Sequence, residues 1–257
     1  MRIDSRSTVE RARTFAARYI PDIAVPIEYY RGERPLFELY GVEDEIQKAL
    51  QRKVQLKSGG YLILDQTEAM TTIDVNTGAF VGHRTLEATI FKTNLEAAQA
   101  ICRQLRLRNL GGIIIIDFID MCDDEHKRQV LCALEKCLAK DHAKTHITEV
   151  SALGLVEMIR ERTRESLEHI LCEPCTCCRG TPKTAETTCY EIFREILHQT
   201  RQFEVETLLV LASQEVIDRL LDEESGHLAE LQEFTGKLVR LQVEALYTQE
   251  RYDVALI

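Results

Sequence analysis

The sequence of 257 residues contains no apolar stretch that approaches the length of a membrane-spanning helix, roughly 20 residues. Its opening segment, Met1 to Arg6, is charged and has no apolar core of the kind found in secretory signal peptides. The first absence excludes a protein held in a membrane by such a helix. Together the two absences favour a cytoplasmic protein.

The sequence also lacks an excess of positive charge, since 32 Lys and Arg face 42 Asp and Glu and the net charge is -10. A protein that coats nucleic acid is usually basic, so this balance argues against that class. It leaves open an enzyme that meets RNA through a local patch and a metal ion. Hydrophobic residues make up 45% of the chain, enough for a sizeable core and one or two domains.

Apolar spacing predicts an α/β arrangement of layers in the middle of the chain, followed by a small α+β unit. Helices are expected over 5–20, 42–50, 87–107, 123–140, 153–171, 184–203 and 214–222. Strands are expected within 59–81 and over 113–116, 145–150, 207–211, 237–243 and 252–256. The segments 20–30 and 35–40 are expected to be short and extended.

Two of the expected strands end in polar side chains. In Ile73 to Asn76 apolar and polar residues alternate, so Asp74 and Asn76 share one face of a strand. Asp117 follows a continuous β-branched run that is typical of a strand buried on both sides. Ligands bind at the carboxyl ends of strands in open α/β sheets, and Mg²⁺ prefers hard oxygen ligands. The sequence therefore predicts a magnesium site.

A simpler interpretation of these residues stays open. Asp74 and Asp117 would then be polar strand ends that cap neighbouring helices, and Asn76 would be a turn residue. Asp120 is a second candidate for the same site if the strand continues past Phe118.

Cysteine is concentrated in one short segment. Of the nine Cys residues, four crowd together as Cys172, Cys175, Cys177 and Cys178. In a cytosolic protein such a cluster indicates metal binding before disulfide formation, although free buried thiols are the alternative. The five other cysteines are expected to be ordinary packing residues.

Long motifs in this chain resemble the ribonuclease E/G family. They occupy 57–78, 94–97, 103–108, 111–121, 163–169 and 247–250. The resemblance covers essentially the whole chain, and its last two motifs are most similar to the C-terminal catalytic portion of the ribonuclease G branch. It implies a DNase-I-like catalytic domain, a zinc link and a small α+β dimerisation domain. These are expected at 50–170, 171–184 and 185–257, after a remnant of the 5′-sensor and RNase-H-like region at 1–49.

The resemblance implies a Mg²⁺-dependent endoribonuclease that cuts single-stranded, A/U-rich RNA and leaves 5′-phosphate ends. Ribosomal RNA 5′-end processing and mRNA turnover are the implied roles. Asp74 and Asp117 would be the Mg²⁺ ligands, with Asn76 supporting the catalytic site. The metal would activate water and neutralise charge on the scissile phosphate.

Basic residues are candidates for RNA binding, Lys144 from the resemblance and the arginines of the helix expected over 87–107 from their shared flank. Lys144 is the position where the family's core contributes a basic residue to a phosphate pocket. Arg103 and Arg106 would line an RNA path together with Arg108. The alternative for the arginines is a solvated helix face paired with the two glutamates of the same helix, Glu87 and Glu96.

By the same resemblance, Cys175 and Cys178 would each ligate a Zn²⁺ that is shared between protomers. One pair supplies two of the four thiolates of a tetrahedral site, so a second copy of the chain would complete it and form a homodimer. The loop after Cys178 is shorter than is usual in the family. Cys172 with Cys175 is therefore a rival pair.

The family's S1 domain and most of its 5′-sensor have no counterpart in this sequence, so a truncated chain is expected. A catalytically weak, zinc-linked dimerisation and RNA-interaction module is the first alternative to an active nuclease. A zinc-ribbon nucleic-acid binder is the second, and the short Cys loop and the negative charge argue against it. Apolar surface left uncovered by the missing regions is expected to promote aggregation.

Overall fold

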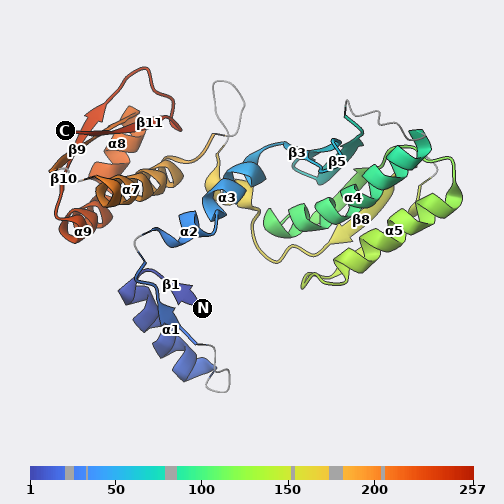
Figure 1. Cartoon of the computed structure of the whole chain (residues 1–257), viewed down its shortest axis with the longest axis horizontal. Coiled ribbons are helices and arrows are strands. Elements are labelled where there is room, and N and C mark those ends of the chain that lie inside the picture. Colours follow the sequence, from blue (N-terminus) through green and yellow to red (C-terminus); the bar gives the residue numbers. More distant parts are fainter. Residues whose placement is uncertain (21–25, 33, 79–85, 152–153, 174–181, 204–205) are drawn as a thin grey trace. The chain divides into compact units, whose positions relative to one another are not determined.

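The computed structural model describes residues 1–20, 26–32, 34–78, 86–151, 154–173, 182–203 and 206–257. These residues form two compact units, which are described separately. One unit is Glu45–Ile170, and the other combines Met1–Asp44 with Leu171–Ile257. Figure 1 labels the elements of both units. The described helices and sheets confirm a mixed α/β fold.

The unit Glu45–Ile170 is built on a six-stranded sheet with the order β3-β4-β5-β6-β8-β7. The strands are β3 (Lys53–Gln55), β4 (Tyr61–Gln66), β5 (Met70–Asn76), β6 (Gly112–Asp117), β7 (Thr145–Val150) and β8 (Val156–Arg160). The pair β5 and β6 is parallel, and the other neighbours are antiparallel. A parallel pair needs a crossover, which the long helix α4 (Leu86–Leu107) supplies here.

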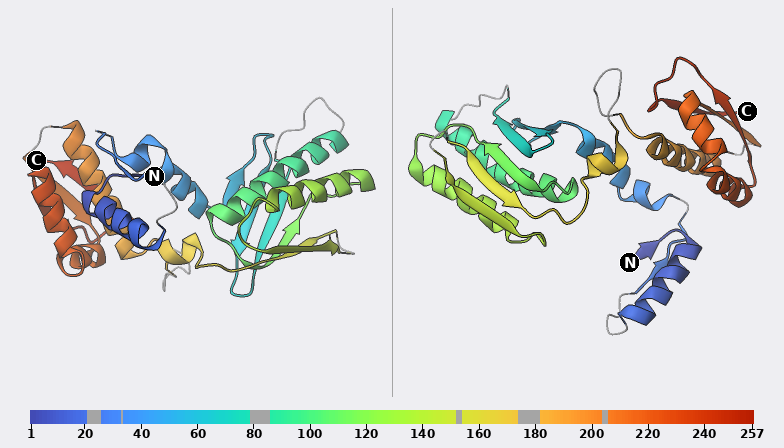
Figure 2. Two further views of the ribbon diagram at one scale, coloured as in Figure 1. Left: turned by 90° about the horizontal axis from the view of Figure 1, so that it is seen from below. Right: turned by 180° about the vertical axis from the view of Figure 1, so that it is seen from behind.

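One face of this sheet is covered by helices. Helix α4 and helix α5 (Asp124–Leu138) lie side by side on the same face (Figures 1 and 2). In β5 the residues Ile73 and Val75 are buried in the core that these helices share, and Asp74 between them is exposed. The helix-free face of the strand therefore carries the polar side chains.

The helix expected over 153–171 is wrong for most of its length. Strand β8 occupies Val156–Arg160, and only the short helix α6 (Leu167–Leu171) is helical. Burial alternates along β8, with Val156 and Met158 in the core and Glu157 and Ile159 outside. A period of two suits a strand with one packed face, and pairing with β6 and β7 stabilises it.

The other unit has its own core beneath a three-stranded sheet of order β10-β9-β11. Its strands are β9 (Thr207–Ala212), β10 (Leu238–Val243) and β11 (Tyr252–Leu256). They pack with helices α7 (Ala185–Gln202), α8 (Gln214–Leu221) and α9 (Ser225–Thr235). Helix α9 was not expected from the sequence, and the other elements confirm the predicted order.

The N-terminal residues of the same unit contain α1 (Arg6–Tyr19), the short parallel strands β1 (Arg2–Ile3) and β2 (Glu28–Tyr29), and α2 (Leu36–Leu39). Helix α3 (Val42–Leu50) continues into the unit Glu45–Ile170. The extended segment expected over 35–40 is wrong, because Leu36–Leu39 is helical. Pro35 directly precedes this turn, and proline is well tolerated at a helix start.

None of the helices in the described part of the chain combines the length and apolar character that crossing a membrane requires.

Candidate active site

Asp74 and Asp117 lie next to each other on the central pair of strands. The parallel register of β5 and β6 places Asp74 opposite Asp117. Neighbouring strands are roughly 4.8 Å apart, and laterally paired residues point to the same face. Both side chains are exposed on the helix-free face. The fold therefore sets two carboxylates side by side at the carboxyl end of the parallel pair.

The buried residues of these strands fix that register. In β6 the side chains of Ile114 and Ile116 are fully buried, and in β5 the side chain of Ile73 is buried as well. A slip of one residue in β5 would turn Ile73 to solvent and carry Asp74 into the core, and a slip in β6 would carry Asp117 there. The free-energy cost of burying these carboxylates keeps Asp74 opposite Asp117.

Asn76 supports Asp74 directly. Its Nδ2 donates a hydrogen bond of 2.8 Å to Asp74 Oδ2, which holds one carboxylate oxygen in place. The backbone next to Asn76 is tightly packed, because a Cβ at Gly60 would stand 2.6 Å from the Asn76 carbonyl oxygen. Gly78 has a positive φ of 68°, and a Cβ there would stand 2.3 Å from the Gly59 carbonyl oxygen. Glycines at these positions let the turns approach each other.

The electrostatics of the pair favour a cation. Partial burial raises the pKa of Asp117 above its ordinary value, and the negative charges of Asp74 and Asp120 raise that pKa further. A divalent ion would relieve this repulsion, and carboxylate oxygens are the ligands that Mg²⁺ prefers. Among the described residues no group of three or more His, Cys, Asp or Glu is placed to hold a metal. Mg²⁺ at Asp74 and Asp117 would therefore complete its coordination with water or substrate oxygens.

The segment that follows Asp117 is held by Asn94, which opens the motif at 94–97 but was given no role in the predicted site. Asn94 of α4 is fully buried, and its Nδ2 donates to the Ile119 carbonyl oxygen at 2.8 Å. Its Oδ1 accepts from the Ile119 backbone N–H at 3.1 Å. Strand β6 has ended at Asp117, so this double contact sets the path of the chain to Asp120. A buried amide on an apolar helix face was the available signal.

The candidate RNA-binding residues lie away from the carboxylates. Lys144 precedes β7, whose first residue pairs with Arg160, and Arg160 pairs with Gly112 at the start of β6. Asp117 is at the other end of β6, roughly 17 Å from Gly112 at about 3.3 Å per residue. The last turns of α4, which carry Arg103 and Arg106, lead back to the start of β6. The structure does not bring these three cations to the carboxylates.

The arginines of α4 do not share one solvated flank, which was one of the two alternatives that the sequence left open. Arg103 pairs with Glu45 of α3. Arg108 is buried and donates to Gln104 and to the Gln51 carbonyl oxygen, each at 2.8 Å. Arg106 is exposed. The sequence pattern of α4 alone could not predict that α3 and the residues before β3 would contact the last turns of α4.

Glu96 binds backbone groups, whereas the same alternative paired it with the arginines of α4. Its carboxylate accepts hydrogen bonds from the backbone N–H groups of Lys57 and Ser58, the latter at 2.9 Å. These contacts tie the turn between β3 and β4 to the helix.

The proposed zinc ligands Cys175 and Cys178 lie outside the described residues, as does Cys177. The two ends of their loop are described and are paired with each other. Cys172 forms an antiparallel bridge with Lys183, and the Glu173 N–H donates to the Pro182 carbonyl oxygen at 2.9 Å. The Thr184 N–H donates to the Leu171 carbonyl oxygen at 2.9 Å. The residues 171–173 and 182–184, called the loop base below, therefore close the Cys-rich loop.

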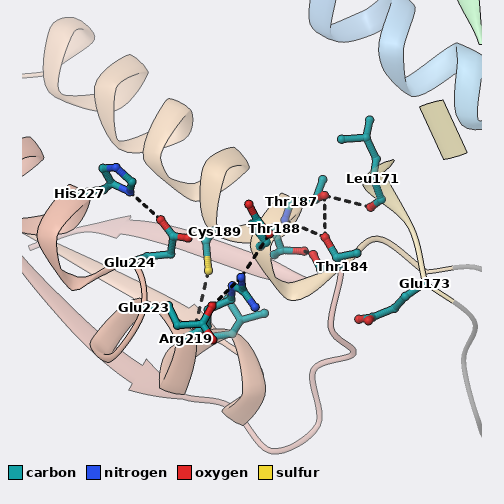
Figure 3. Close-up of polar contacts among 12 residues, drawn as sticks. Leu171, Glu173, Thr184, Thr187, Thr188, Cys189, Arg219, Glu223, Glu224 and His227 are labelled. Carbon is teal, nitrogen blue, oxygen red and sulfur yellow. Dashed lines mark hydrogen bonds and ion pairs between the residues drawn. The ribbon is translucent and has the colours of Figure 1, made fainter. Parts of the chain in front are cut away.

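Two further groups of contacts hold the loop base. Thr187 of α7 donates from its hydroxyl to the Leu171 carbonyl oxygen at 3.0 Å (Figure 3). The Gln249 side chain donates to Glu173 and, at 2.9 Å, to the Lys183 carbonyl oxygen. Glu250 accepts from the Lys183 N–H at 2.7 Å. The motif at 247–250 thus anchors both sides of the loop base.

The five cysteines expected to be packing residues differ in burial. Cys102 and Cys189 are buried, Cys122 is exposed, and Cys132 and Cys137 are half-buried. Burial raises the pKa of both Cys102 and Cys189 to about 12. Those two thiols therefore stay protonated at neutral pH.

Comparison with known proteins identifies the family. The profile described as "Ribonuclease E/G family" matches residues 1–163, which include both aspartates. The chain belongs to the ribonuclease E/G family. It is 60% identical to "Ribonuclease G" of Salmonella typhimurium (strain SL1344) and 58% identical to "Ribonuclease G" of Escherichia coli (strain K12). Both matches cover 100% of this chain and 53% of the relative.

A more distant member of the ribonuclease E/G family matches a smaller share of the chain. "Ribonuclease E" of Escherichia coli (strain K12) is 40% identical over 86% of this chain and 21% of its own length. The chain thus spans about half the length of the ribonuclease G relatives.

Proposed function

We propose that this chain carries the catalytic centre of a Mg²⁺-dependent endoribonuclease that cuts single-stranded, A/U-rich RNA and leaves 5′-phosphate ends. One observation carries the proposal. Asp74 and Asp117 stand in register on neighbouring parallel strands, on the face of the sheet that α4 and α5 leave open. The names of the ribonuclease G relatives support RNA as the substrate.

In this proposal Asp74 and Asp117 hold Mg²⁺, which when bound activates water and neutralises charge on the scissile phosphate. Asn76 orients Asp74 through its 2.8 Å hydrogen bond. Gly60 and Gly78 allow the close backbone packing beside Asn76. Asn94 fixes the chain that leaves the site. A DNase-I-like arrangement of this unit is part of the same proposal.

The proposed second metal is Zn²⁺, bound by Cys175 and Cys178 and shared with a second copy of the chain. The closed loop base supports this proposal, because it would hold a short thiolate-bearing loop at a defined place. Four thiolates from two protomers would complete the tetrahedral site and link a homodimer. A cytoplasmic location, with ribosomal RNA precursors and mRNA as substrates, belongs to the proposal as well.

The proposal is tested with a 5′-monophosphorylated, A/U-rich RNA and Mg²⁺. We expect Asp74→Asn to lower the cleavage rate at least about a hundredfold, because a metal ligand and several kcal/mol of charge stabilisation are lost. Its melting temperature without Mg²⁺ should stay the same or rise, because one of two facing negative charges is removed. Cleavage products and thermal unfolding are measured on the same samples.

Glu157→Gln is the matched control. Glu157 is an exposed carboxylate of β8, paired with Ile115 on the same face as Asp117, and its loss should leave cleavage unchanged. A folded parent protein that does not cut RNA with Mg²⁺ would contradict the nuclease proposal. If zinc chelation still separates a dimer of that protein, the zinc-linked interaction module is the better description.

A further inference from the structure

A pocket is lined by the residues that directly follow Asp117, the last residue of β6. It has a volume of about 340 Å³ and lies between the chain after β6, helix α5, the residues Ser151 and Gly154 and the start of β8. Among its described lining residues are Phe118, Asp120, Lys127, Leu131, Ser151 and Val156. The volume is at the lower end of the roughly 300–1,000 Å³ typical of small-molecule sites. Its lining combines apolar side chains with polar groups in about equal measure.

The wall nearest the carboxylates is held in place before any ligand binds. Asn94 grips both backbone groups of Ile119, which lies in this wall between Asp117 and Asp120. Phe118 and Val156 are buried beneath the pocket, at 7% and 2% exposure. Because this apolar wall is already ordered, little entropy is lost by the protein when a ligand packs on it. A flat and rigid ligand also loses little entropy of its own on binding.

The polar groups of the pocket include both hydrogen-bond donors and hydrogen-bond acceptors. The Asp120 carboxylate points toward Gly154, because a Cβ at Gly154 would stand 3.8 Å from Asp120 Oδ1. Lys127 brings a cation, which pairs with Asp124 at 3.0 Å and is half-exposed. Ser151 accepts from the Leu155 N–H at 3.2 Å, and its hydroxyl hydrogen is directed elsewhere. A ligand with apolar faces and a polar edge would match this set.

We propose that the pocket binds one nucleobase of the RNA strand next to the scissile phosphate, and that Asp120 selects a base with an exocyclic amino group. Single-stranded RNA is read through bases that are splayed out, packed on side chains and hydrogen-bonded along their edges. A carboxylate accepts from the amino group of adenine and repels the carbonyl oxygen that uracil presents there. In an A/U-rich strand the pocket therefore takes adenine.

The proposal rests on the proposed nuclease function for the identity of the polymer, but its test does not require cleavage. Two fluorescein-labelled 2′-O-methyl RNA octamers are compared by fluorescence anisotropy without added Mg²⁺, one all-uridine and one with adenosines at alternate positions. The parent protein should bind the adenosine octamer roughly tenfold more tightly, the effect of one hydrogen bond to a charged group.

Two variants address the pocket and one serves as a control. Leu131→Trp fills the space between α5 and the loop wall and should remove the preference for adenosine. Asp120→Asn changes an exposed side chain, which keeps the fold intact, and should relax the preference because an amide also donates to uracil. Lys136→Trp places the same ring on the exposed side of α5 and should retain the full tenfold difference.

The possible outcomes distinguish failure of the pocket proposal from failure of the nuclease proposal. Equal binding of the two octamers by the parent, or an adenosine preference that survives in Asp120→Asn and in folded Leu131→Trp, would overturn the pocket proposal. An adenosine preference that both variants lose would support it even if the parent does not cut RNA. Cleavage without any base preference would leave the nuclease proposal standing and remove this one.

Discussion

Asp141 and Arg160 form a buried ion pair at the end of the main sheet opposite the aspartates. Their side chains are only 5% and 4% exposed, and Arg160 Nε lies 2.9 Å from Asp141 Oδ2. Burial alone would raise the pKa of Asp141. Hydrogen bonds from Arg160 and from the Ala143 N–H outweigh it and hold that pKa below its ordinary value. Arg160 also donates to the Leu110 carbonyl oxygen at 2.7 Å, which joins β8 to the chain before β6.

We expect Asp141→Ala to lower the free energy of unfolding by about 3–5 kcal/mol, because it leaves a buried guanidinium without its counter-charge. The depressed pKa means that this stabilisation is fully present above the ordinary Asp pKa of about 3.9. It is lost as the pH falls through the lower, folded-state pKa of Asp141. The difference between parent and variant should therefore shrink only in strong acid, as measured by urea unfolding at several pH values.

Asp124→Ala is the comparison at the surface. Asp124 pairs with Lys127, but its side chain is 93% exposed, so its loss should cost at most about 1 kcal/mol. If both alanine variants lost the same free energy of unfolding, burial would not make the Asp141–Arg160 pair more stabilising than the exposed Asp124–Lys127 pair.

At the scale of elements, the loop base is the clearest example of a motif that acts far from its own place in the sequence. Gln249 and Glu250 lie between β10 and β11, yet they bind both sides of the base of the Cys-rich loop. In known metal sites, hydrogen bonds that orient the ligands typically change metal affinity by roughly 10–100-fold when removed. In the proposed zinc link, the loop base would hold together the two ends of the segment that carries Cys175 and Cys178.

We expect Gln249→Ala to weaken zinc binding by about 10–100-fold while the core of the same unit stays folded. Zinc affinity is measured by competition with a chromophoric chelator, and dimer content by sedimentation at the same zinc concentration. Glu233→Gln, an exposed change on α9, should leave both unchanged. Unaltered zinc affinity in folded Gln249→Ala would show that the loop orders itself without these contacts.

At the scale of the whole molecule, the described residues form two hydrophobic cores that belong to different units. One core, in Glu45–Ile170, includes Leu134 of α5. The other, in the unit that ends at Ile257, includes Leu220 of α8. Both leucines are fully buried. Separate cores allow separate cooperative unfolding transitions.

We expect calorimetry to show two transitions, each sensitive to one core. Leu134→Ala should lower only the transition of Glu45–Ile170, and Leu220→Ala only the other, each by about 2–5 kcal/mol. Site-specific probes in the two sheets identify which transition is which. A single transition that both variants shift equally would mean that the units unfold together.

Much of this architecture follows from local patterns. The alternation in β5 predicted that Asp74 and Asn76 share a face, and the hydrogen bond between them confirms that placement. The helix spacing of α4 and the β-branched run of β6 predicted those elements nearly to their ends. Periodicity sufficed because burial of one face depends on neighbours a few positions away.

Other features depend on residues that are distant in the sequence. The opposition of Asp74 and Asp117 arises from packing β5 and β6 against α4, and the strand β8 from pairing with β6 and β7. The sequence by itself determined which residues could form strands, helices and a carboxylate site. Only the tertiary structure decided that Asn94 would hold Ile119 and that Lys144 would lie far from the aspartates, because such contacts join segments that no local pattern links.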